Sequence, residues 1–139
     1  MQTFLPYPDF RKSMRVLDFR RLGKQRVEAC QILVALAIEG PWANHPATTM
    51  WRGYDAALEQ YMRGAILEWV RRGYKNTMTI PKLRKFVKPP WVGDPSFHAA
   101  HRSNLLRKDP VYYGQFGWAE PDDLPYIWPG DRKNGYHSE

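Results

Sequence analysis

The sequence has little cysteine and no long apolar run. Cys30 is the single cysteine among 139 residues, so the chain cannot form a disulfide within itself, and one thiol is typical of a reducing compartment. It lies among apolar residues at helical spacing, and we interpret it as a core residue, not a nucleophile. No stretch of about 18 apolar residues and no signal-peptide pattern is present. We therefore expect a cytoplasmic protein with no membrane partner.

Acidic residues are also scarce, because 14 Asp and Glu stand against 21 Lys and Arg, which leaves a formal net charge of +7. Such an excess favours a polyanionic partner, with nucleic acid ahead of a membrane surface. The 43% hydrophobic and 14% aromatic content argues against disorder. We expect a single domain over residues 1–139, a monomer, with about the last ten residues frayed.

Several catalytic signatures are missing. The chain has no Gly-x-Ser-x-Gly elbow and no Gly-rich phosphate loop. The pair His98 and His101, even with His45 and Cys30, lacks the pattern of a zinc site. We therefore expect no metal and no cofactor. The remaining cations, amides and carboxylates suit phosphate positioning together with acid–base chemistry on a nucleic acid.

Apolar residues at helical spacing predict three main helices, over about 18–39, 47–72 and 95–108. The first ends at Gly40-Pro41, and the third begins at Asp94-Pro95, a cap followed by proline at the first helical position. The middle helix carries the longest apolar stripe: Met50, Tyr54, Ala57, Leu58, Tyr61, Ala65, Ile66 and Trp69. We expect an all-α fold, a compact bundle with an extended N-terminal arm and an irregular aromatic C-terminal segment.

The first helix places cations where the helix dipole disfavours them. Asp18 is the expected N-cap, and four cations follow it within about two turns: Arg20, Arg21, Lys24 and Arg26. This arrangement indicates an anionic partner. The alternative is a solvated surface in which Lys24 and Glu28 form an ordinary ion pair four residues apart.

Three segments carry a family resemblance: Leu17 to Lys24 (LDFRRLGK), residues 53–74 with their Tyr-Asp opening and Arg-Gly-Tyr exit, and residues 102–114, which end in Asp-Pro-Val-Tyr-Tyr-Gly. Together they resemble the pyrimidine-dimer DNA glycosylase (endonuclease V) family known from phages. The stretches RLGKQRVEA, NHPATTMW and HRSNLLRKDP are similar to a bacterial and phage branch grouped with that family.

The resemblance implies an all-α domain whose N-terminal arm threads between helices. It also implies binding of double-stranded DNA with a nucleotide flipped out of the stack. Family members cleave the glycosyl bond with the α-amine of their first residue, which forms a Schiff base, and a helix glutamate assists. This chain departs at both places, because the bulky Gln2 favours retention of Met1 and because Arg21 stands at the glutamate position. The family's two basic positions match Arg20 and Lys24.

The candidate catalytic residues follow from these departures. Glu28, one turn past Lys24, is the first choice for the carboxylate, and Asp18 is the second. A lysine amine beside arginines suits Schiff-base chemistry, so Lys24 is a candidate nucleophile, with the amine of Met1 as the alternative. Candidates for stacking a flipped base are Trp51, Trp91 and Tyr112. The candidate DNA-binding residues are Arg20, Arg21, Gln25, Arg26, His45, His98, His101, Arg102 and Asn104.

The sequence thus favours a DNA glycosylase that excises a damaged or modified base from duplex DNA, with or without cleavage of the strand at the abasic site. Two other functions stay open. One is a non-catalytic DNA-binding protein on the same fold. The other is an enzyme that acts on a modified base or nucleoside without excision.

Overall fold

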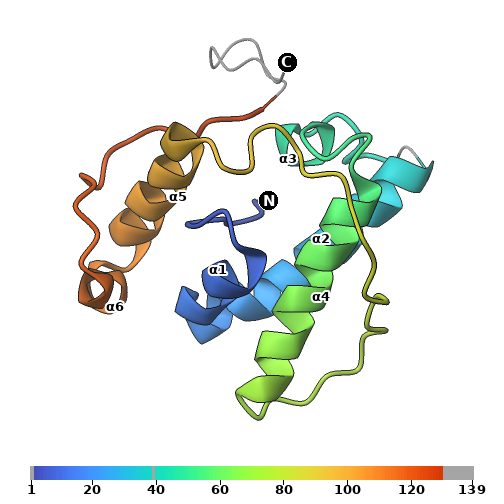
Figure 1. Ribbon diagram of the computed structural model, residues 1–139, viewed down its shortest axis with the longest axis horizontal. Helices are drawn as coiled ribbons and strands as arrows, with labels where there is room; N and C mark the ends of the chain where they lie inside the picture. The colour runs from blue at the N-terminus through green and yellow to red at the C-terminus, as the bar shows by residue number, and fades with distance from the viewer. Residues whose placement is uncertain (1, 39, 130–139) are drawn as a thin grey trace.

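A computed structural model describes residues 2–38 and 40–129, and within them the chain is helical and forms no strand (Figure 1). This confirms the all-α class. The expected fraying of the last ten residues lies outside the described part. No described helix is both long and apolar enough to cross a membrane. The elements are α1 (Phe10–Val16), α2 (Phe19–Ile38), α3 (Pro46–Thr49), α4 (Asp55–Arg71), α5 (Pro95–Lys108) and α6 (Pro110–Tyr113), followed by a 3-10 turn, η1 (Gly114–Phe116).

Two of the three predicted helices are confirmed within a residue of their expected bounds, and the middle one is wrong as a continuous helix. The chain leaves helical geometry between α3 and α4, where Gly53 has φ of +87°. Glycine adopts this left-handed conformation without steric cost. The apolar stripe continues across the break because both Met50 and Tyr54 pack against the core on either side of the turn.

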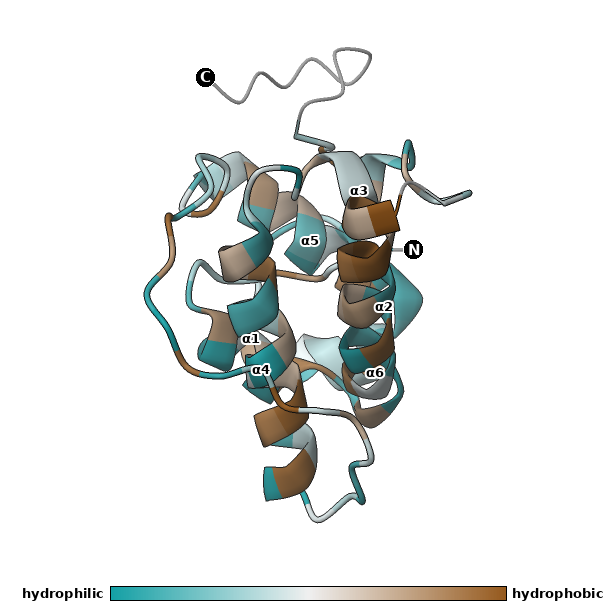
Figure 2. Ribbon diagram, turned by 90° about the vertical axis from the view of Figure 1, so that its right-hand side faces the viewer, coloured by the Kyte–Doolittle hydropathy of each residue, from teal (hydrophilic) through white to brown (hydrophobic). Residues whose placement is uncertain are grey.

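Helices α2 and α4 lie side by side and form the main packed pair (Figure 2). They pack tightly at Gly23, where an added Cβ would lie 3.0 Å from the ring of Trp69. A larger residue at this position would therefore push the indole away. The guanidinium of Arg26 covers the same indole at 4.2 Å from the ring centre. The aromatic ring is thus enclosed between α2 and the start of the segment that follows α4.

The N-terminal arm runs extended and buried among α2, α4 and α5, as the resemblance implied (Figure 1). Its backbone has no strand partner, so side chains from the helices supply the hydrogen bonds that a buried backbone requires. The N–H of Phe4 donates to Oε1 of Gln25 at 3.0 Å, and the hydroxyl of Tyr61 donates to the Phe4 carbonyl at 2.8 Å. Arg102 donates to the carbonyl of Pro6 at 2.7 Å.

Two histidines of α5 hold the backbone of Leu5 from both sides. The Leu5 N–H donates to Nδ1 of His101 at 2.8 Å, and Nδ1 of His98 lies 2.8 Å from the Leu5 carbonyl. Because Nε2 of His98 accepts the N–H of Gly93, the proton of a neutral His98 ring is on Nδ1 and is donated to Leu5. Burial lowers the pKa of both rings, that of His101 to about 3. Both histidines are therefore neutral and structural.

These contacts correct the expectation that His98, His101 and Asn104 contact DNA. All three side chains are buried. Asn104 donates to the carbonyls of Ala100 and Leu124 and so fastens the C-terminal segment onto α5. Gln25 is buried as well, and its side-chain oxygen is used by the arm. A polar residue on a helix can face a buried backbone as readily as a ligand, and helical spacing alone does not distinguish the two.

We predict that the free energy of unfolding falls as the pH is lowered from about 6.5 towards 3. In that range the unfolded state binds a proton at His101 that the folded state does not, so stability rises with pH. One such proton contributes a slope of about 1.4 kcal/mol per pH unit. Urea unfolding of wild type and His101→Asn, whose oxygen can still accept the Leu5 N–H, measures this slope. Equal slopes in the two proteins would contradict the assignment.

Candidate functional site

A cavity of about 770 Å³ opens between the arm, α2, the end of α5 and the C-terminal segment. Its volume lies in the range of pockets that hold small-molecule-sized ligands. Several of the predicted site residues line this one cavity, six from the start of α2 and its cap and one from the loop before α3. They are Asp18, Arg20, Arg21, Lys24, Gln25, Glu28 and His45.

Glu28 connects the cavity to the N-terminal arm. One of its carboxylate oxygens accepts the backbone N–H of Gln2 at 3.2 Å. Lys24 is exposed and forms no ion pair with Glu28 among the residues that the structure covers, so the solvated-pair alternative is not what the described side chains adopt. Met1 lies outside the described residues, and the expectation about its amine stays a prediction. A carboxylate from α2 therefore lies beside the first described backbone nitrogen of the arm.

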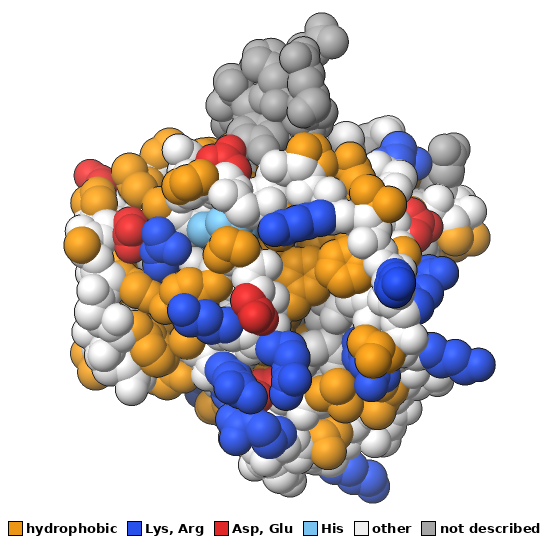
Figure 3. All heavy atoms as spheres, in the orientation of Figure 1, with side chains coloured by type: hydrophobic (Ala, Val, Ile, Leu, Met, Phe, Trp, Pro, Cys, Tyr) orange, Lys and Arg blue, Asp and Glu red, His pale blue; other side chains and the backbone are white. Residues whose placement is uncertain are grey.

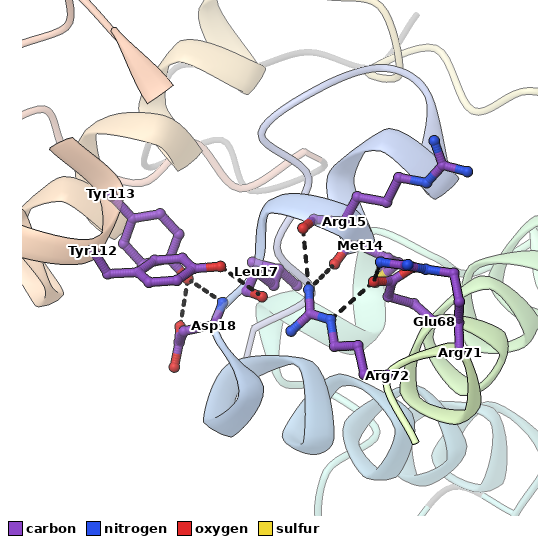
Figure 4. A network of polar contacts seen from close by, with 9 residues as sticks. All are labelled: Met14, Arg15, Leu17, Asp18, Glu68, Arg71, Arg72, Tyr112 and Tyr113. Carbon is purple, nitrogen blue, oxygen red and sulfur yellow. Dashed lines mark hydrogen bonds and ion pairs between the residues drawn. The ribbon is translucent and has the colours of Figure 1, made fainter. Parts of the chain in front are cut away.

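Neighbouring donors hold the carboxylate of Asp18, and Figure 4 shows one of them, Tyr113. Its carboxylate accepts the hydroxyl of Tyr113 at 2.5 Å and Nη1 of Arg21 at 3.1 Å, and its backbone N–H donates to the same hydroxyl. Burial by itself raises the pKa of Asp18, but the hydrogen bonds from Tyr113 and Arg21 outweigh it, and the pKa lies below its usual value. The carboxylate is thus ionised and joins the start of α2 to α6.

A second polar cluster fixes α1 against α4 (Figure 4). Arg72 at the end of α4 donates to the carbonyls of Met14 and Arg15, the last turn of α1. Its guanidinium also binds the buried carboxylate of Glu68 at 2.9 Å, and Arg71 binds the same carboxylate. Because Glu68 sits between two guanidinium groups, its charge is compensated without solvent. This cluster fixes α1, whose C-terminus leads directly into α2 and the cavity.

His45 lines the cavity from the loop before α3. Its Nδ1 accepts the N–H of Ala47 at 3.0 Å and so caps that short helix. The imidazole packs against the rings of Trp42 and Trp128, whose centres are 5.8 and 6.0 Å away. Burial lowers the pKa of His45, while the charge of Glu28 acts in the opposite direction. One hydrogen bond and two aromatic contacts therefore orient the His45 side chain.

The aromatic wall of the cavity is a feature that sequence reasoning missed. Phe4, Tyr126 and Trp128 line it, together with Phe19, which is 51% exposed. The expected stacking residues Trp51 and Trp91 are wrong, because both are fully buried in the core. The aromatic composition of the C-terminal segment was the available signal. This composition indicated that the C-terminal segment packs around the helices, but it did not indicate which of its aromatic rings line the cavity.

Positive charge surrounds the cavity opening. Arg20, Lys24 and Lys108 are exposed at its edge, and Arg21 is half-buried beside them. Burial, followed by the charges of Arg21, Arg107 and Lys24, lowers the pKa of Lys108. Cations gathered at one opening favour the entry of an anion. Lys108 was another residue that the sequence did not single out, since it lies at the far end of α5.

Two of the predicted DNA-binding arginines are used elsewhere. Arg26 packs on Trp69 and donates to Asn76, and Arg102 pairs with Glu120 at 2.9 Å while it holds the arm. Neither lines the cavity, unlike Arg20, Arg21, Gln25 and His45. A further group of Lys and Arg side chains gathers over α1 and the end of α4 (Figure 3). Its exposed members include Arg11, Lys12, Arg15 and Arg71.

The comparison with protein families decides the relationship. The model of the family described as pyrimidine dimer DNA glycosylase matches residues 1–82. This chain belongs to that family. The match contains the arm and the elements α1 to α4, and with them Glu28, His45 and the cations of α2. Lys108, Tyr126 and Trp128 lie beyond it. No curated protein and no solved structure matches the chain.

Proposed function

We propose that this protein is a DNA glycosylase that removes a damaged or modified pyrimidine from double-stranded DNA. One observation carries the proposal: the arm, a carboxylate and a ring of cations meet at one cavity in a member of a glycosylase family. A glycosylase must extrude its target nucleotide, and the cavity volume of about 770 Å³ is sufficient for one.

The cavity residues divide into three roles. Arg20, Arg21, Lys24 and Lys108 hold phosphates next to the flipped nucleotide. The aromatic wall stacks the base, since any base offers a π face. Glu28 lies where it accepts a proton from the attacking amine and stabilises the positive charge that develops on the sugar. Asp18 keeps the start of α2 in place and takes no part in the chemistry, because its oxygens are already bonded.

The attacking amine is a group of the chain itself, as in the family. Lys24 and the α-amine of Met1 are the candidates from the sequence. Lys108 is a third, because it also lines the cavity and has a lowered pKa, which increases its uncharged and nucleophilic fraction.

Binding to duplex DNA should depend steeply on salt. If Arg20, Arg21, Lys24 and Lys108 each neutralise one phosphate, the plot of log K against log salt has a slope of roughly −3.6. Fluorescence anisotropy with a labelled abasic duplex measures it. Arg20→Gln should reduce the slope by about one, whereas Lys85→Gln, which removes the same charge outside the cavity, should leave it nearly unchanged. A flat salt response contradicts DNA binding at these cations.

Glu28→Gln should abolish base release and leave DNA affinity nearly intact, because it removes a carboxylate and no cation. The assay follows release of free base from duplexes that carry a panel of pyrimidine lesions and modified bases. Asp123→Asn, an equal change in charge at an exposed position outside the cavity, is the matched control and should keep wild-type release. If Glu28→Gln releases base as fast as wild type, the carboxylate assignment is wrong.

Borohydride trapping identifies the amine. Reduction of the Schiff base on abasic duplex should give a covalent complex, and mass spectrometry of its peptides locates the bond at Met1, Lys24 or Lys108. Lys24→Arg and Lys108→Arg keep the charge and remove the primary amine, so only the variant of the true nucleophile should fail to trap. Trapping that survives in both variants points to the α-amine.

A DNA-binding protein without chemistry is the second candidate, and the presence of Arg21 at the family's glutamate position favours it. DNA binding with the expected salt slope, combined with no base release across the panel and no trapping, would establish that function instead.

A further inference from the structure

We propose that His45 is a neutral hydrogen-bond donor to the departing base, with its Nε2–H directed at the pyrimidine keto oxygen beside the glycosidic nitrogen. The inference rests on the proposed glycosylase function and adds a residue to it. It gives a specific role to His45, which the sequence places among the candidate DNA-binding residues.

The tautomer of His45 follows from its cap. Nδ1 accepts the backbone N–H of Ala47 at 3.0 Å, so this nitrogen carries a lone pair. In the neutral ring the proton must then be on Nε2, where it can only be donated. Protonation of Nδ1 would place its N–H opposite the N–H of Ala47, and the cap hydrogen bond would be lost. The ring is therefore held as a neutral donor and not as an imidazolium.

The position of the ring suits a ligand inside the cavity. Trp42 and Trp128 each pack against the imidazole, and the N–H of Ala47 orients it through the cap hydrogen bond to Nδ1. The same cavity is lined by Glu28, whose charge reaches His45, and by the rings of Tyr126 and Trp128 against which a base can stack. His45, Glu28 and these rings line one cavity, so in the proposed complex a base stacked on the aromatic wall receives the Nε2–H of His45.

The chemistry needs such a donor. When the bond between C1′ and N1 of the pyrimidine breaks, its electron pair stays on the base, and the negative charge is shared with the keto oxygen. The new bond forms between C1′ and the attacking amine, whose proton passes to Glu28. His45 keeps its proton throughout and stabilises the anionic base by hydrogen bonding, in the manner of an oxyanion hole.

Two variants separate this role from the cap. His45→Asn keeps an N-cap acceptor and loses the distant donor, so it should melt close to wild type and release base about 100-fold more slowly. His45→Gln places an amide N–H near the former Nε2 and caps poorly. It should melt lower and yet release base faster than His45→Asn. If His45→Asn releases base at the wild-type rate, the inference is wrong. Base release by the wild-type protein would still support the glycosylase function.

The dependence of the rate on the leaving base distinguishes a contact with that base from a purely structural role. A base with a more acidic N1, such as 5-fluorouracil, departs with less need of a donor than uracil does. The rate loss of His45→Asn should therefore be smaller for 5-fluorouracil than for uracil in the same duplex. Equal losses for the two bases contradict a contact with the departing base.

Nitrogen NMR of the histidines tests the same idea without catalysis. At neutral pH His45 should show a protonated Nε2 and an unprotonated Nδ1, and free uracil should shift the Nε2–H resonance. If no substrate of the panel is turned over, the glycosylase function fails, and this titration still decides whether His45 reads a keto base. A protonated Nδ1, or no shift with uracil, overturns the inference.

Discussion

An extended backbone that crosses the interior must have a hydrogen-bond partner for every N–H and C=O group. In this protein, side chains of the surrounding helices supply such partners to the N-terminal arm. The arm has no neighbouring strand, so the helices contribute side chains to it. His98 and His101 bind both backbone groups of Leu5, and Gln25 binds the N–H of Phe4. An unpaired buried amide costs about as much as a lost hydrogen bond, so these polar residues contribute to stability although they lie among apolar neighbours.

The N-terminal arm also links the stability of the fold to the candidate site. Glu28 is bonded to the N–H of Gln2, so the proposed catalytic carboxylate is part of the arm's hydrogen bonding. Helix α2 serves three surfaces at once. Gly23 allows contact with Trp69 on α4, Gln25 faces the arm, and Lys24 reaches the cavity edge. Because these three roles fall on consecutive residues within one helical turn, a small change in the orientation of α2 would disturb all of them.

The cations at the start of α2 have an energetic cost that a purely structural helix would avoid, since they oppose its dipole. One of them, Arg21, is compensated by Asp18, and Tyr113 stabilises that carboxylate further. Arg20 and Lys24 remain exposed at the cavity, and Lys108 joins them from α5. Cations gathered from two elements around one opening favour a phosphate-bearing ligand, which agrees with membership of a DNA glycosylase family.

The sequence by itself determined the features that depend on neighbouring residues. Helical spacing, the cap at Asp94 and the Gly-Pro stop after α2 set the helix bounds, and composition set the excess of positive charge. The motifs around Asp18 to Lys24 determined the family resemblance. Only the tertiary structure decided which polar residues face the arm and which face the cavity, because those contacts join positions such as Leu5 and His101 that are far apart in the chain. For the same reason only the packing of α5 and of the C-terminal segment brought Lys108, Tyr126 and Trp128 to the cavity that α2 lines.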